Sequence, residues 1–341
     1  MYTDFYHFAG QPFQLTPDPH FYFDSSAHRK AMTYLGYGLS QGEGFIVITG
    51  EIGSGKTTIV SHLAETLDRS KLTLGSIVTT HVDDGELLRL VAQAFALDAS
   101  GLDRAEILTK IEAFLRNEAR AGRRVLLVVD EVQTLSVDAL DALRMLSNFQ
   151  DGERSLIQIF LLGQPEFRDK LASPELEQLA QRVIATHHLD PVAPGEVKAY
   201  LAHRLSLVGW DEDPRFDAGA IAAFYRHTGG IPRRLNTLAH RVLLAGGLEQ
   251  RHTIDASFVD AVAADLARDS GEEPHPTAVR GARRAGLNAA LPDGTLTRRI
   301  VELEHRLEQN EEALRRVLTL LVDWVERDNN SVANVARDNA A

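Results

Sequence analysis

The chain has 341 residues, a formal net charge of −12 and no cysteine. A chain without cysteine has no disulfide bonds, no thiolate metal site and no cysteine nucleophile, and it fits a reducing compartment. The acidic balance argues against a general nucleic-acid coat, since the phosphate backbone attracts basic surfaces. The apolar and charged fractions, 44% and 25%, are those of an ordinary globular protein.

The N-terminal stretch does not resemble a signal peptide. It reads MYTDFYHFAGQPFQLTPDPHFYF and has neither a cationic start nor a continuous apolar run. The longest apolar runs, at 125–129 and 159–162, are far shorter than the roughly 20 residues that a membrane helix needs. We therefore expect a cytoplasmic protein without membrane insertion, peripheral to the inner membrane only through partners.

Four apolar runs bounded by turn residues predict the strands of a parallel sheet: 45–49 (FIVIT), 76–80 (SIVTT), 125–130 (VLLVVD) and 156–163 (LIQIFLLG). Segments with helical spacing separate them, as at Leu87, Leu88, Val91 and Phe95. This alternation predicts a three-layer α/β fold in which helices cover both faces of the sheet. A weaker fifth strand is expected at 183–189.

The α/β domain is assigned to 1–193 together with the N-terminal segment, and the chain after it divides into four segments. Helical patterns punctuated by glycine predict a small lid at 194–267. Residues 268–295 are rich in Gly, Pro and charge, which predicts a flexible linker.

A heptad pattern follows at 296–327, where apolar residues step by four and three with Asn310 as the one polar position of the seam. The pattern predicts a coiled-coil helix that joins protomers. The alternative is a single amphipathic helix that packs back on the lid. Residues 328–341 are expected to be a disordered tail.

The stretch GEIGSGKTT, residues 50–58, directly follows the first predicted strand and directly precedes a helical run. It satisfies the phosphate-loop pattern G-x-x-x-x-G-K-[ST], in which backbone N–H groups surround the β-phosphate and the helix N-terminus faces the anion. The lysine reaches the β- and γ-oxygens, and the threonine ligates Mg²⁺. The residues predicted to bind the nucleotide are Gly50, Glu51, Ile52, Gly53, Ser54, Gly55, Lys56, Thr57 and Thr58.

Two adjacent carboxylates end the strand VLLVVD. Asp130 is predicted to hold Mg²⁺ together with Thr57, and Glu131 to orient an attacking water. A structural ion pair is the weaker alternative, because buried carboxylates are costly without a cation. A small-molecule kinase would need no water-activating glutamate here, and the guanine signature N-K-x-D of GTPases is absent from the sequence. The pattern therefore predicts hydrolysis of ATP.

Several polar residues could support this chemistry. Gln164 follows the strand 156–163, where it could touch the γ-phosphate or the water, or could cap the turn at Pro165. Arg182 and Arg233 are candidates for the arginine that stabilises charge in the transition state, and Arg204 competes for that role. For Arg182 a solvated salt bridge is an equal alternative.

The combination of FYHFAGQPFQLTPDPHFYF, HRKAMTYLGYGLSQGEGFIVITGEIGSGKTT, LLVVDEVQTL, LLGQPEF, LAQRV and TGGIPRRLN resembles the ExeA/GspA-type AAA+ ATPases, particularly their exosortase (PEP-CTERM) locus-associated branch. The resemblance covers residues 1 to about 265. It implies an AAA+ module with Walker A at 50–57, Walker B at Asp130 and Glu131, sensor one at Gln164, a finger at Arg182 and sensor two at Arg233. It also implies that the N-terminal segment, with His28 and Tyr34, lies beside the adenine.

The resemblance implies a homo-oligomeric motor or switch with a protein partner in a bacterial envelope secretion, protein-sorting or exopolysaccharide export system. ExeA-like proteins often continue through a membrane helix into a peptidoglycan-binding domain, whereas this chain offers a linker and a heptad helix. One alternative is a DNA-associated regulatory ATPase of the transposition-helper type, favoured by the basic run at 279–286 and opposed by the overall acidity. Another is a nucleotide-binding scaffold without turnover, which Glu131 argues against.

Overall fold

The computed structural model describes residues 2–14, 18–66, 68, 70–79, 83–152 and 154–270, which all belong to one compact unit. The heptad helix predicted at 296–327, the tail at 328–341, the basic run at 279–286 and the linker from residue 271 onward lie outside the described residues. The interpretations made for them therefore stay predictions.

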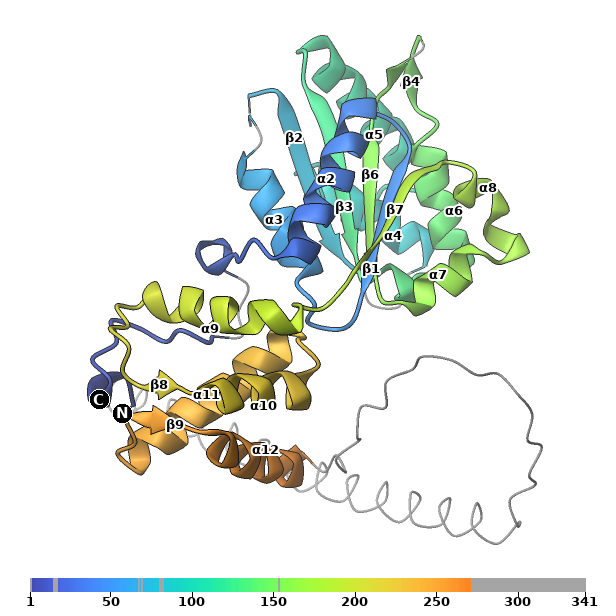
Figure 1. The fold of residues 1–341 in the computed structure, drawn as a ribbon. Coiled ribbons are helices and arrows are strands. Elements are labelled where there is room, and N and C mark those ends of the chain that lie inside the picture. The colour runs from blue at the N-terminus through green and yellow to red at the C-terminus, as the bar shows by residue number, and fades with distance from the viewer. Residues whose placement is uncertain are drawn as a thin grey trace, which may run out of the picture. The chain divides into compact units, whose positions relative to one another are not determined.

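The central sheet has five parallel strands, as the apolar runs predict (Figure 1). Their order across the sheet is β2 (Leu72–Val78), β3 (Arg124–Asp130), β6 (Gln158–Gly163), β1 (Phe45–Gly50) and β7 (Val183–Leu189). Every residue of β1 and β6 is buried, which is typical of a parallel strand covered on both faces. β2 begins earlier than predicted because it is an edge strand with alternating exposure, so its first residues lack a continuous apolar pattern.

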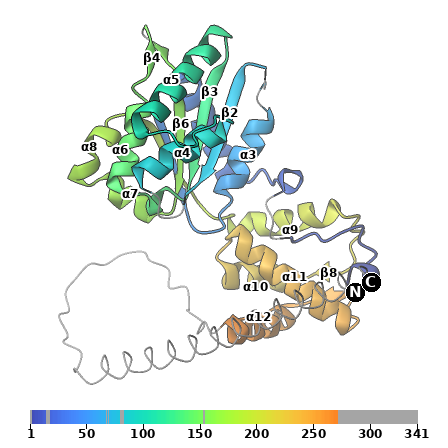
Figure 2. The same cartoon turned by 180° about the vertical axis from the view of Figure 1, so that it is seen from behind.

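Two helical layers cover the sheet. Helices α2 (Ser26–Gln41) and α3 (Lys56–Thr66) lie in front of it in Figure 1, and α4 (Asp84–Ala94), α5 (Arg104–Arg120) and α6 (Val137–Leu146) cover the other face in Figure 2. Successive strand residues point to opposite faces, so Ile46 and Ile48 pack under α2 and α3, while Val47 packs under the other layer.

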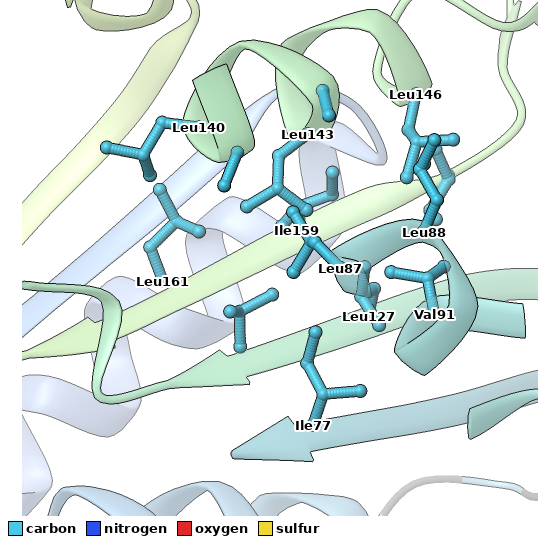
Figure 3. Packing of buried hydrophobic residues seen from close by; sticks show 14 of the residues in the cluster. Ile77, Leu87, Leu88, Val91, Leu127, Leu140, Leu143, Leu146, Ile159 and Leu161 are labelled. Carbon is cyan, nitrogen blue, oxygen red and sulfur yellow. The ribbon is translucent and has the colours of Figure 1, made fainter. Parts of the chain in front are cut away.

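The larger apolar cluster lies between the strands and α4, α5 and α6. Figure 3 shows Leu87, Leu88 and Val91 of α4 packed against the sheet beside the leucines of α6. Each fully buried leucine or isoleucine contributes roughly 1.5–3 kcal/mol of transfer free energy. The helical spacing predicted for α4 therefore identifies the face that holds this helix on the sheet.

The register of the strands brings three chain segments to one edge. Gly50 pairs with Leu189, Thr49 pairs with Gly163, and Asp130 pairs with Val78. The carboxyl ends of β1, β3 and β6 therefore meet, and ligands of open α/β sheets bind outside such ends.

The C-terminal part of the described chain is helical, and it covers the residues for which we predict a lid. It consists of α9 (Val197–Ser206), α10 (Ala218–Thr228), α11 (Pro232–Leu248) and α12 (Ala256–Ser270), with the short parallel strands β8 (Arg215–Phe216) and β9 (Thr253–Ile254). Gly229, at φ 60°, ends α10, and Pro232 occupies the first turn of α11. Helix α12 continues beyond the predicted end of the lid at residue 267.

The first part of the N-terminal segment, residues 2–13, packs on the helices that follow residue 193, whereas Tyr22 stacks on His62 of α3. Tyr2, Tyr6, Phe8 and Phe13 are buried in the same apolar cluster as the inner faces of α9, α10 and α11. The hydroxyl of Tyr6 donates to the carbonyl oxygen of Arg251 at 2.8 Å. Residues 2–13 therefore pack with the later helices, whereas the prediction groups them with the α/β domain at 1–193, because aromatic content predicts burial without identifying the surface that buries it.

The remaining described elements are short. They are α1 (Tyr2–Phe5), η1 (Pro19–Phe21), η2 (Val132–Thr134), β4 (Gln150–Asp151), β5 (Arg154–Ser155), α7 (Glu166–Leu171), η3 (Pro174–Leu176), α8 (Glu177–Ala180) and η4 (Pro194–Glu196).

Candidate active site

The loop between β1 and α3 has the backbone of a phosphate-binding loop. Gly53 and Gly55 have φ angles of 78° and 98°, a region that side chains other than glycine rarely adopt. A Cβ atom on Gly53 would lie 2.3 Å from Cβ of Arg233, and one on Gly55 would lie 2.9 Å from Nε2 of His28. The two glycines therefore allow the loop to turn and also allow these two side chains to approach it.

Lys56, the first residue of α3, is buried against this loop with 6% of its surface exposed. Its Nζ donates to the carbonyl oxygens of Gly50 at 2.8 Å and Glu51 at 3.1 Å. Burial lowers the pKa of Lys56, and the carboxylates of Asp130 and Glu131 act in the opposite direction. A buried ammonium group at a helix N-terminus fits an anionic ligand such as a nucleotide phosphate.

Thr57 and Asp130 meet beside the loop, although they are far apart in the sequence. The Oγ1 hydroxyl of Thr57 donates to Oδ2 of Asp130 at 2.5 Å, and Asp130 is almost fully buried. A hydroxyl and a carboxylate are oxygen ligands of the kind that Mg²⁺ takes. Mg²⁺ is usually bound by one or two protein ligands together with water and substrate phosphates, so the side chains of Thr57 and Asp130 fit this ion.

Glu131 follows Asp130 in the chain and lines a pocket together with Lys56 and Thr57. Its backbone is left-handed, with φ 57° and ψ 36°, which is uncommon for a residue with a side chain. Its Oε2 accepts hydrogen bonds from Nε2 of Gln133 at 2.5 Å and from Nε2 of Gln164 at 3.2 Å. The structure thus brings Gln164 to the carboxylate that we predict to orient water.

The pocket above the loop is enclosed by the N-terminal segment and by the lid. Its lining comprises Gln14, Asp18, Phe21, Tyr22, Phe23, His28, Ile52, Gly53, Gly55, Lys56, Thr57, Thr58, Glu131, Tyr200, Arg204, Pro232, Arg233 and Asn236. Loop, lid and N-terminal residues therefore share one pocket. Tyr34, which the resemblance places near the adenine, instead stacks on His187 at a ring distance of 4.9 Å.

His28 stays neutral in this pocket. Burial lowers its pKa to about 4. The Ser25 oxygen accepts from the backbone N–H of His28 at 3.2 Å and lies 2.7 Å from Nδ1. A neutral imidazole has one N–H donor and one acceptor nitrogen. Nε2 of His28 faces Gly55, since a Cβ atom there would lie 2.9 Å from it, so His28 places a neutral polar ring beside the phosphate-binding loop.

The two arginines predicted to act on the phosphate lie in different places. Arg233 lines the pocket at the start of α11. Arg182 is exposed and donates to Oγ of Ser147 at 3.3 Å, and its carbonyl oxygen accepts from Phe45, the first residue of β1. It therefore lies at the opposite end of the sheet, roughly 20 Å from the loop by strand length. Arg182 is therefore too far from the phosphate-binding loop of its own chain to contact it.

Arg204, the third candidate, holds the N-terminal segment on the lid. Its Nε donates to the carbonyl oxygen of Pro12 at 2.8 Å, and its guanidinium lies 4.6 Å from the ring centroid of Phe21. The side chain is buried within its own protomer, which does not fit a finger reaching a neighbour. The cation–π contact was not predicted, because nothing local relates Arg204 to Phe21.

Comparison with known proteins agrees with this architecture. Residues 39–171 match a family model described as AAA domain. The ORC2 protein of Aeropyrum pernix gives a TM-score of 0.54 at 16% identity, covering 70% of this chain and 66% of that one. Cdc6p of Pyrobaculum aerophilum gives 0.55 at 14% identity, covering 76% and 86%. The fold is therefore that of an AAA-type P-loop NTPase, and at these identities the likeness shows the fold alone.

One further relative is more similar in sequence than these two solved structures. The chain is 34% identical over 275 residues to General secretion pathway protein A of Aeromonas hydrophila, which covers 80% of this chain and 50% of that protein. Together with the AAA domain match, this confirms the resemblance to the ExeA/GspA-type AAA+ ATPases. The chain spans about half the length of this relative. Among the described helices, none is both long and apolar enough to cross a bilayer.

Proposed function

We propose that the protein binds ATP with Mg²⁺ and hydrolyses it to ADP and phosphate, as a motor or switch in a bacterial secretion system. The observation that carries the proposal is the meeting of Thr57, Asp130 and Glu131 beside the loop that holds Lys56. A phosphate site, a cation site and a carboxylate able to orient water thus share one pocket.

The roles in this chemistry fall to the loop amides and to Lys56, Thr57, Asp130 and Glu131. Loop amides and Lys56 would bind the phosphates, and Thr57 and Asp130 would hold Mg²⁺, which when bound would supply positive charge to the phosphate oxygens. Glu131 orients a water molecule whose oxygen bonds to the γ-phosphorus as the bond to the β-phosphate oxygen breaks, and its carboxylate accepts the proton. Both amide donors bond to Oε2, so Oε1 can face the water.

The proposed role in secretion rests on the similarity to General secretion pathway protein A and on the sequence motifs. The printed name of the relative supports a role in secretion. The N-terminal and lid motifs favour the finer assignment to an exosortase-associated protein-sorting or exopolysaccharide export system. We place the protein in the cytoplasm, reaching the envelope through a protein partner.

Assembly is part of the same proposal. Because exposed Arg182 lies far from its own pocket, it would complete the site of a neighbouring protomer in a homo-oligomer. The heptad pattern at 296–327 supports the same association.

The experiment that tests hydrolysis compares phosphate release by the parent, Glu131→Gln and Glu177→Gln. Glu177 is an exposed glutamate on α8 and serves as the control for the same chemical change. We expect Glu131→Gln to lose about 10²- to 10⁴-fold in kcat while nucleotide affinity stays within about threefold, as for loss of a general base. Equal phosphate release by all three proteins would refute the assignment of Glu131.

The DNA-associated alternative rests on the basic run at 279–286, outside the described residues. A titration of DNA binding across salt separates the two functions, because phosphate contacts make the affinity fall steeply with salt. Tight, salt-sensitive binding that stimulates hydrolysis would favour the alternative.

A further inference from the structure

Gln133 lies two residues after Glu131, in the turn η2. We infer that Gln133 is a positioning residue: its side-chain amide holds the carboxylate of Glu131 and ties it to the backbone of Gln164. This inference rests on the hydrolytic function proposed above, because it concerns the geometry of the group that orients the water.

The link consists of two hydrogen bonds that use opposite ends of one amide. Nε2 of Gln133 donates to Oε2 of Glu131 at 2.5 Å. Oε1 of Gln133 accepts from the backbone N–H of Gln164 at 3.0 Å. The side chain of Gln133 therefore joins the carboxylate of Glu131, which follows β3, to the backbone at the end of β6.

The chemistry of the partners fixes the orientation of this amide. A backbone N–H can only donate, so the Gln133 atom facing Gln164 has to be the carbonyl oxygen. An ionised carboxylate can only accept, so the atom facing Glu131 has to be the NH₂ group. A flipped amide would lose both bonds and would place two oxygen atoms together, so the link has one stable arrangement.

The surrounding backbone holds Gln133 in place. The carbonyl oxygen of Glu131 accepts from the backbone N–H of Thr134 at 3.0 Å and from its hydroxyl at 2.8 Å, which closes η2. Nζ of Lys170, on α7, donates to the carbonyl oxygen of Gln133 at 3.3 Å. Gly163 leaves room for the side chain, because a Cβ there would lie 3.2 Å from Oε1 of Gln133.

The link matters because the backbone of Glu131 is left-handed and therefore strained. Hydrogen bonds at Oε2 restrict the rotamers of the Glu131 side chain. The orientation of Oε1 is therefore fixed before a water molecule binds. A displacement of a catalytic group by about 1 Å can lower the rate by about 10²-fold. A shift at the end of β6, where Gln164 begins the turn into α7, would reach Glu131 through Gln133.

Two substitutions at this position separate the two bonds. Gln133→Glu keeps an acceptor for the N–H of Gln164 but loses the donor to Glu131. Gln133→Leu loses both partners at similar volume. Gln93→Glu, on the exposed face of α4, repeats the charge change away from the site.

Steady-state ATP hydrolysis and hydrogen exchange of the Gln164 amide are measured for all four proteins. We expect both Gln133 variants to lose on the order of 10- to 100-fold in kcat with KM within about threefold, as for a misplaced catalytic group. The Gln164 amide should exchange at the parental rate in Gln133→Glu and at least about tenfold faster in Gln133→Leu, because only leucine removes its acceptor. Gln93→Glu should match the parent in both measurements.

Other outcomes would overturn the inference. A parental kcat in both Gln133 variants, a rise in KM alone, or parental exchange of the Gln164 amide in Gln133→Leu would each show that the link does not position Glu131. Absence of hydrolysis by the parent would instead refute the proposed function. The exchange measurement would still decide whether Gln133 binds Gln164.

Discussion

The backbone N–H of Arg233 donates to the carbonyl oxygen of Gly53 at 3.1 Å, so the first turn of lid helix α11 rests on the phosphate-binding loop. Gly53 can accept this approach because it has no side chain. A change in the conformation of the loop on nucleotide binding would therefore act directly on the first turn of α11. The contact gives the lid a physical route for sensing the nucleotide.

Gly53→Ala should weaken nucleotide binding by at least about tenfold. Alanine at φ 78° is strained by about 1–2 kcal/mol, and its Cβ would collide with Arg233. Titration with a fluorescent nucleotide measures the effect. Gly152→Ala is the matched control, because Gly152 has φ 61° but no atom within 4 Å of the added Cβ. It should lose stability without losing affinity, and equal affinity loss in both variants would contradict the role of the contact.

Thr57→Val should raise the Mg²⁺ concentration needed for half-maximal hydrolysis by about tenfold, since one oxygen ligand is lost at nearly constant volume. Affinity for the nucleotide in the presence of EDTA should stay within about twofold. Thr66→Val removes a hydroxyl from the far end of α3, where it donates to the carbonyl oxygen of Leu63, and should behave as the parent. An unchanged Mg²⁺ dependence in Thr57→Val would contradict the cation site.

His28 should make the protein less stable in mild acid. Burial lowers its pKa from 6.5 to about 4, so between these values the unfolded chain binds a proton that the folded chain does not. Its contribution is present above about pH 6.5 and is lost as the pH falls toward 4. At about 1.4 kcal/mol per pKa unit, the free energy of unfolding falls by about 3 kcal/mol across this window.

The measurement for His28 is urea unfolding at several pH values between 4 and 7. His28→Gln should show a flatter decline than the parent, whereas His20→Gln, at an exposed position of the N-terminal segment, should follow the parent. Parallel declines in the parent and in His28→Gln would show that the buried imidazole is not the group responsible.

Arg182 should act between protomers. Arg182→Ala and Lys56→Met should each be nearly inactive alone, but a mixture should recover up to about a quarter of the parental rate, because sites with an intact Lys56 then meet neighbours with an intact Arg182. A mixture of Lys56→Met with Glu131→Gln is the control, since both lesions lie in one pocket. A mixture as inactive as this control, or an Arg182→Ala protein with parental turnover at every concentration, would exclude a finger in trans.

Much of the fold and the centre of the site could be predicted because their signals are local. Buried strands such as β1 and β6 are continuous apolar runs, and the loop at 50–58 needs its glycines within a few residues of its lysine. The predicted start of the edge strand β2 is four residues too late, since only two of its seven residues are buried and they form no continuous apolar run.

The sequence by itself determined the local chemistry of this protein: an α/β sheet, a phosphate-binding loop and a carboxylate pair at a strand end. Only the tertiary structure decided that Gln133 joins Glu131 to Gln164 and that Arg204 makes a cation–π contact with Phe21. It also decided that the aromatic residues of 2–13 pack on the lid helices. These contacts join residues from separate elements, and side-chain type alone does not specify a partner that is distant along the chain. Strand order and packing select the partner, because they alone decide which polar groups share a buried space.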